Sequence, residues 1–138
     1  ILEAIVLPAY DKIMEVISFS ERMIGEGEAY SFKKFRNVIN SSILRIAKNF
    51  RLELLILFQG TEGTRFEKTR QELIALIEDR IYEGMLKKFG LDVQEAVFLS
   101  KIIAHAFLDS MFMVISEVEC NENLKKMIDW LNNYFFDH

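Results

Sequence analysis

The sequence predicts an all-α fold, an orthogonal and antiparallel bundle of six helices. Apolar residues recur at spacings of three and four along nearly all of the 138 residues, which is the period of an amphipathic helix. Pairs of glycines interrupt this pattern at 25–29 and 60–63, where we expect turns. Only one segment resembles a buried strand, and it has no second strand to pair with.

The first two helices are predicted at residues 2–24 and 31–49. Pro8 removes a backbone hydrogen-bond donor from the first helix, so we expect a kink or a restart there. Ser31 is suited to be the N-cap of the second helix, because its hydroxyl can accept a hydrogen bond from the first turn. We expect that helix to end near Asn49.

The third and fourth helices are predicted at residues 51–59 and 64–89. The first of these contains LELLILF, which could also be the buried strand mentioned above. Helix is the better interpretation, because a strand needs a partner. Thr64 opens the longer helix, and Gly90 follows it at the position where a left-handed C-cap is common.

Residues 92–119 form the predicted central helix, with Asp92 as its N-cap. It is apolar over roughly two thirds of its circumference, whereas a surface helix usually has a stripe of only ~100° or a little more. The last helix starts at Asn121 or Asn123 and ends near Phe136, as an antiparallel neighbour. We therefore expect the central helix to pack inward on its own domain and outward on a second copy.

Composition limits the class of protein. The length indicates one domain over residues 1–138, and 51% hydrophobic residues exclude a disordered chain. A net charge of -4 argues against a nucleic-acid surface on this segment itself. The one cysteine, Cys120, permits no intrachain disulfide, so a cytoplasmic location is the simplest. No apolar run approaches the ~18 residues of a membrane span, and we expect no membrane partner.

The residues predict no catalytic site, no metal site and no cofactor, and hence no enzyme. A di-iron carboxylate bundle needs Glu-x-x-His pairs, but neither His105 nor His138 follows a glutamate at that spacing. These histidines and one cysteine are too few for a zinc site. Glu119 and Glu122 should raise the thiol pKa of Cys120 and disfavour a nucleophile. No phosphate-binding glycine loop is present.

Aromatic residues and methionines on the earlier helices could line an adaptable pocket for an apolar or amphipathic small molecule. Ordinary core is the alternative for each of them. The planar guanidinium of Arg70 could bind an anionic group of that molecule, or it could pair with a glutamate on a neighbouring helix or extend into solvent. The predicted ligand-binding residues are Tyr10, Met14, Phe35, Ile39, Phe58, Phe66, Arg70, Leu73, Ile77, Ile103, Phe107 and Met111.

The outer face of the central helix mixes aromatic and polar side chains, opposite an inward line of Ile103, Phe107 and Val114. Such a mixture suits a protein–protein surface better than core or open solvent. His105 and Asp109 on this face could form a hydrogen bond that keeps the imidazole charged, or could be a plain surface pair. The predicted dimer-interface residues are Phe98, Lys101, His105, Asp109, Phe112, Ser116, Trp130 and Tyr134.

Four stretches carry this pattern: ILEAIVLPAYDKIMEVI, ILRIAKNFRLELLILF, TRFEKTRQELIALIEDRIYEGMLKKFGLDVQEAVFLSKIIAHAFLDSMF and LKKMIDWLNNYFF. In order, they resemble the linking helix, the helix with an Asn-containing break, the long helix with the first dimerisation helix, and the final helix of one known domain. That domain is the C-terminal effector-binding and dimerisation domain of TetR-family transcriptional regulators. The resemblance covers essentially the whole chain.

The resemblance implies a homodimer held by a four-helix bundle, with residues 93–119 and 121–136 from each subunit. A small-molecule effector would bind among the earlier helices and shift the linking helix, so that the DNA-binding headpieces no longer match their operator. The helix-turn-helix headpiece is missing from this chain, which opens in a helical pattern without an initiator methionine. DNA would be bound only through that N-terminal domain. We expect the ligand-sensing domain of a repressor; the alternative is a free-standing helical protein-interaction module.

Overall fold

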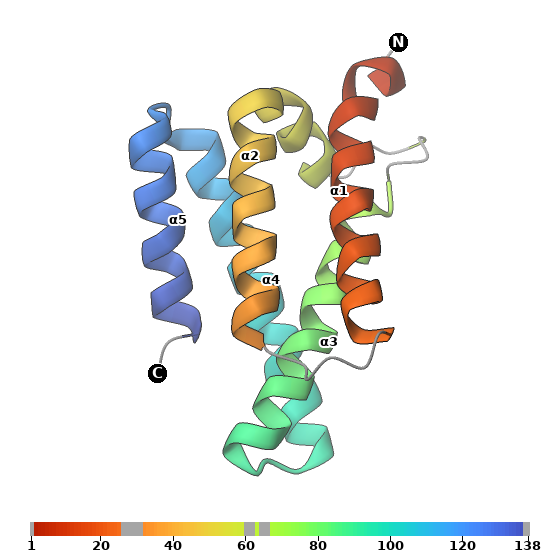
Figure 1. Ribbon diagram of the computed structural model, residues 1–138, viewed down its shortest axis with the longest axis vertical. Helices are drawn as coiled ribbons and strands as arrows, with labels where there is room; N and C mark the ends of the chain where they lie inside the picture. The colour runs from red at the N-terminus through yellow and green to blue at the C-terminus, as the bar shows by residue number, and fades with distance from the viewer. Residues whose placement is uncertain (1, 26–31, 60–62, 64–66, 137–138) are drawn as a thin grey trace.

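The computed structural model describes residues 2–25, 32–59, 63 and 67–136, and Figure 1 shows the arrangement of their helices. This part of the chain contains helices and no strands, so the all-α prediction is confirmed for it. The elements are α1 (Leu2–Gly25), α2 (Phe32–Gln59), α3 (Thr69–Phe89), α4 (Val93–Glu117) and α5 (Asn121–Phe136).

The predicted count of six helices is wrong, because five helices account for the helical residues described. The predicted second and third helices form one bent element, α2, in which only Phe50 has non-helical angles (φ -138°, ψ 45°). Just before the bend, the side-chain amide of Asn49 donates to the carbonyl of Arg45 at 3.2 Å. The guanidinium of Arg51, just after it, donates to the carbonyl of Val118 beyond the end of α4. The helix therefore changes direction at one residue and resumes.

Some helix ends lie where the capping residues predict them, and others do not. α1 continues through Pro8, so the chain does not restart there. Gly90 has a positive φ of 62° after α3, which confirms the predicted left-handed C-cap. α3 begins at Thr69, later than predicted, with Lys68 as its N-cap. The predicted starting residues Ser31 and Thr64 lie outside the described residues.

The core contains buried residues from all five described helices, and α2 contacts each of the other four. In Figure 1, α2 stands between α1 and α5. α4 packs against α2, α3 and α5, and its buried line consists of Ala104, Leu108, Met111 and Ile115. The predicted inward line of Ile103, Phe107 and Val114 lies on a neighbouring side of the helix. Phe107 is buried, but Ile103 and Val114 are only half-buried.

By length and composition alone, α4 is apolar enough to cross a membrane. The length of a continuous apolar run does not reveal this property, because Lys101 and Asp109 interrupt the run. In the fold, α4 packs against three neighbouring helices. A core helix with the same composition passes the same test, so the finding is weak support for a membrane span.

Asp92 caps the N-terminus of α4, as predicted. Its Oδ1 accepts a hydrogen bond from the backbone N–H of Glu95 at 2.9 Å. This bond, followed by the contact with the Glu95 side chain, lowers the pKa of Asp92. The same side-chain hydrogen bond, together with charge repulsion, raises the pKa of Glu95. The two carboxyl groups therefore titrate as a pair with opposite shifts.

This cap gives a pH-dependent prediction. We expect Asp92→Ala to lower the melting temperature at neutral pH, and Asp92→Asn to retain most of it, because asparagine caps a helix about as well as aspartate. The folded pKa of Asp92 is depressed, so its charge stabilises the fold above the ordinary aspartate pKa. That contribution is lost as the pH falls through the lowered pKa. Glu95, whose pKa is raised, has the opposite sign.

Thermal unfolding followed by circular dichroism from neutral to acidic pH tests this prediction. Both the aspartate and asparagine forms are measured in a Glu95→Gln background, which removes the opposing titration. The difference in melting temperature should shrink as the solution becomes acidic. A difference that is constant with pH would show that the cap acts without its charge.

Candidate functional site

The predicted ligand-binding residues lie mainly in the core, as far as the structure describes them. Those that are buried are Ile39, Leu73, Ile77, Phe107 and Met111, and those that are half-buried are Tyr10, Met14, Arg70 and Ile103. The side chains of Phe35 and Phe58, and the whole of Phe66, lie outside the described residues. None of the twelve residues lines either of two pockets that described residues form, one between α2 and α5 and one between α3 and α4. Their role in binding an apolar effector stays a prediction.

Phe107 connects α4 to the end of α5. Its ring meets Phe135 edge-on at 5.8 Å and Phe136 at 5.1 Å between ring centroids. Such edge-to-face pairs stabilise beyond the burial of their area. The side chain identified from the sequence as a pocket residue is therefore also a contact between the two helices that the resemblance assigns to dimerisation.

Polar residues on one flank of α4 face α3. The guanidinium of Arg70 on α3 forms an ion pair with Asp109, so it pairs with an acidic residue of a neighbouring helix, an aspartate rather than the expected glutamate. The Nδ1–H group of His105 donates to the carbonyl of Lys101 at 2.9 Å, and Nδ1 lies 3.8 Å from a carboxylate oxygen of Glu78 on α3. His105 and Asp109 therefore each have a partner other than the other.

The predicted dimer residues consequently fall into separate environments. Lys101 and Ser116 are exposed, while Phe112 is half-buried and packs against the core of its own chain. Phe98, Trp130 and Tyr134 are exposed large side chains. α3 contacts part of the side of α4 that was predicted to face a second copy. The periodicity of apolar residues in α4 does not show where α3 packs.

α4 and α5 both carry large apolar side chains that are exposed; we call this set of residues the α4–α5 face. On α5 the polar residues face α2, so the apolar residues lie on the opposite flank. On α4 the exposed apolar residues lie opposite the buried line, and Asp109, which pairs with α3, lies among them on the helix circumference. The face consists of Phe98, Leu99, Ile102, Met113, Met127, Trp130 and Tyr134.

The two aromatic rings at the α5 end of this face are ordered by each other. Trp130 and Tyr134 stack with an interplanar angle of 6° and a centroid distance of 5.5 Å. Four members of this surface were not among the predicted interface residues: Leu99, Ile102, Met113 and Met127. The signal that could have identified them is their position opposite the buried line of α4, or beside Trp130 on α5.

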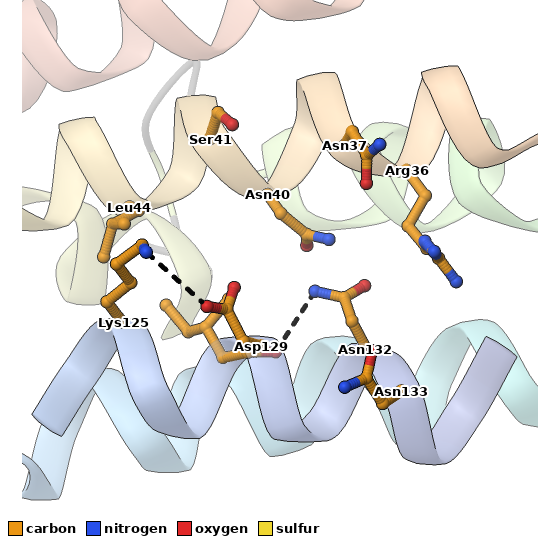
Figure 2. Close-up of a pocket in the computed structure, with 10 residues that line it drawn as sticks. Arg36, Asn37, Asn40, Ser41, Leu44, Lys125, Asp129, Asn132 and Asn133 are labelled. Atoms are coloured by element: carbon orange, nitrogen blue, oxygen red, sulfur yellow. Dashed lines mark hydrogen bonds and ion pairs between the residues drawn. The ribbon is translucent and has the colours of Figure 1, made fainter. Parts of the chain in front are cut away.

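A polar cleft of about 370 Å³ separates the first half of α2 from α5 (Figure 2). Two asparagine side chains face each other across it, Asn40 from α2 and Asn132 from α5. None of these residues was predicted as a binding residue from the sequence. The lining residues are Arg36, Asn37, Asn40, Ser41, Leu44, Lys125, Ile128, Asp129, Asn132 and Asn133.

A second pocket, of about 330 Å³, lies between α3 and α4. It is lined by Ala75, Glu78, Asp79, Tyr82, Val97 and Ser100. The hydroxyl of Ser100 donates to the carbonyl of Ala96 at 2.7 Å, so the one buried polar side chain of this pocket is satisfied within its own helix. This pocket therefore shows no polar atom that requires a ligand.

Cys120 corrects one electrostatic prediction. The expected rise of its thiol pKa is wrong: the backbone N–H of Asn123, and then that of Glu122, lower the pKa. The reason is that Cys120 immediately precedes α5, where free N–H groups of the first turn point towards it. The cysteine is exposed. Within the described residues, no group of three or more histidine, cysteine, aspartate or glutamate side chains is arranged to hold a metal ion.

Comparisons with protein-family models, with curated proteins and with solved structures gave no significant match. The function is therefore inferred from the surfaces of the chain itself.

Proposed function

We propose that this chain is the ligand-sensing and dimerisation domain of a TetR-like transcriptional repressor. The observation that carries the proposal is the α4–α5 face, where seven large apolar side chains are exposed on two consecutive helices that pack together. Apolar patches of this kind are typical of protein interaction surfaces. A second copy related by a two-fold axis would cover the face and complete a four-helix bundle.

The composition of the α4–α5 face supports a specific interface. Trp130 and Tyr134 form a rigid aromatic pair near its α5 end, and aromatic residues of this type contribute most of the binding energy in many interfaces. Met113 and Met127 add flexible apolar side chains that adapt to a facing surface. In a two-fold arrangement every one of these contacts occurs twice, once from each subunit.

Effector binding and DNA release complete the proposed function. Tyr10 and Met14 pack half-buried against the core from α1, so a ligand that displaced the core would shift this helix. α1 would transmit the shift to a DNA-binding domain preceding Ile1. The effector would act by binding one of two dimer geometries more tightly than the other. The repressor would work in the cytoplasm, and DNA would contact only the preceding domain, which is consistent with the net charge of -4 here.

The same face is compatible with a second function, a helical interaction module that binds a different protein. The exposed methionines favour this alternative, because methionine-rich surfaces often accept several partners. The residues encoded upstream of Ile1 distinguish the two functions. A segment of about 50 residues with a helix-turn-helix pattern supports the regulator, and any other domain supports the interaction module.

Sedimentation equilibrium tests the dimer directly. We expect a two-fold assembly at micromolar concentrations of the chain, with no added partner. A monomer at high micromolar concentration would overturn the homodimer and leave the interaction module as the better account of the α4–α5 face.

A further inference from the structure

We propose that the pocket between α3 and α4 binds a small organic cation, an ammonium group on a short apolar chain. The two helices lie side by side in the fold (Figure 1). None of the predicted ligand-binding residues and no member of the α4–α5 face lines this pocket. The proposal therefore stands whether or not the chain is part of a TetR-like repressor, and whether or not it forms a dimer.

The apolar part of the pocket comes from both helices. Ala75 and Tyr82 lie two helical turns apart on α3, so their side chains share one side of that helix. Val97 lines the pocket from α4 and is 52% exposed. An alkyl chain that covers Ala75, Val97 and the ring of Tyr82 removes apolar surface from water on both molecules, which favours binding.

A carboxylate that a ligand can reach lies beside this apolar surface. Glu78 is one turn from both Ala75 and Tyr82 on α3, and 31% of its side chain is exposed. Its Oε1 lies 3.8 Å from Nδ1 of His105, which is longer than a hydrogen bond. The Nδ1–H group donates instead to the carbonyl of Lys101 at 2.9 Å. Among the described residues, no lysine or arginine forms an ion pair with Glu78.

The charge of the pocket favours a cation. Two carboxylates line it, Glu78 and Asp79, and none of the described lysines or arginines does. Oδ2 of Asp79 already pairs with Nη1 of Arg80 at 2.8 Å, so Glu78 is the carboxylate left to attract a ligand. An ammonium group donates charge-assisted hydrogen bonds to a carboxylate. The aromatic face of Tyr82 also attracts cations.

The size of the pocket limits the ligand to a small molecule. A volume of about 330 Å³ lies at the lower end of the range for small-molecule sites, which suits a short-chain amine. The pocket is stable when empty, because Ser100 is bonded within α4 and Glu78 reaches water. The ligand therefore replaces water at an accessible carboxylate and covers the apolar surface beside it.

Three probes with the same six-carbon chain separate the charge from the apolar contact. Hexylamine carries an ammonium group at neutral pH, hexanoate carries a carboxylate, and 1-hexanol carries no charge. Isothermal titration calorimetry on the full chain at physiological salt should detect binding of hexylamine. Hexanoate and 1-hexanol should bind at least about tenfold more weakly, because only the ammonium group pairs with Glu78.

Two glutamates on α3 provide a matched pair of variants. Glu78→Gln keeps the shape of the pocket, removes its free carboxylate and should weaken the binding of hexylamine at least about tenfold. Glu72→Gln changes the net charge of the chain by the same amount, but Glu72 is exposed and lies outside the pocket. This control should bind hexylamine as the wild-type protein does.

Two valines on α4 provide a second pair, which decides the proposal even if Glu78→Gln fails to fold. Val97→Lys places an ammonium group of the chain itself in the pocket and should abolish the binding of hexylamine. Val93→Lys adds the same charge one turn earlier, at an exposed valine that does not line the pocket, and should leave binding unchanged.

Loss of hexylamine binding in the two pocket variants, but in neither control, supports the proposal. If hexylamine does not bind the wild-type protein at about 10 mM, which is weaker than most specific ligands, the proposal is overturned. Equal binding of the three probes, or undiminished binding in either pocket variant, also overturns it, because the ligand would then recognise apolar surface without Glu78.

Discussion

Replacing Trp130 with glutamate should convert the homodimer into folded monomers. Trp130 is 59% exposed within one chain, so the substitution removes little from the subunit core. In the proposed dimer the indole is buried, and truncation of such a residue typically weakens binding by about 2 kcal/mol or more. A two-fold dimer contains Trp130 once in each subunit, so the total loss of binding free energy is about 4 kcal/mol. This corresponds to roughly a thousandfold weaker association.

A matched control separates the α4–α5 face from exposed apolar residues in general. Leu52 on α2 is 64% exposed, similar to Trp130, but lies on a different helix. Leu52→Glu should sediment as a dimer, and Trp130→Glu as a monomer with an unchanged circular dichroism spectrum. If both variants remained dimers, the second copy would have to bind elsewhere. Phe112→Glu is unsuitable as a probe, because that half-buried ring packs against the core of its own chain.

The largest loss of stability should come from Phe107→Ala. The ring is 3% exposed and meets two further phenylalanine rings of α5, so truncation leaves a cavity at the contact between the last two helices. Such a change typically costs about 3 to 5 kcal/mol of unfolding free energy. Phe107→Leu keeps most of the volume and should cost less than about 1.5 kcal/mol.

Urea denaturation measures these losses as shifts of the midpoint at constant slope. The variants should be compared in the Trp130→Glu background, because dimerisation would otherwise add to the apparent stability. Phe98→Ala is the matched control, since this exposed ring lies on the same helix. Equal costs for Phe98→Ala and Phe107→Ala would contradict the assignment of Phe107 to the core.

Local signals predicted the ends of several helices correctly, because a cap involves only neighbouring residues. Asp92 and Gly90 are examples: each acts on the adjacent turn, and both were identified from position alone. For the bend at Phe50, the interruption was predicted but the continuation as one helix was not. The sequence indicates an interruption after Asn49, but whether the helix resumes in the same element depends on packing against distant residues such as Val118.

Which side of a helix faces which neighbour was less predictable. The apolar character of α4 was evident, yet Asp109, on the same side of the helix as the exposed apolar residues, pairs with Arg70 of α3. The polar cleft was missed for the same reason. Asn40 and Asn132 belong to segments far apart in the chain, and an isolated asparagine in a helix has no pattern that distinguishes a buried site from a solvated surface.

The contrast between the two flanks of α5 has a consequence for insertions and deletions. Its 16 residues place Trp130 and Tyr134 on the apolar flank, and Lys125 and Asn132 beside α2. One added or removed residue turns everything after it by ~100° around the helix axis. A single-residue insertion before Trp130 would therefore take the later members of both surfaces out of position, although many single substitutions on this helix change only one surface. The length of α5 is more tightly constrained than most of its individual residues.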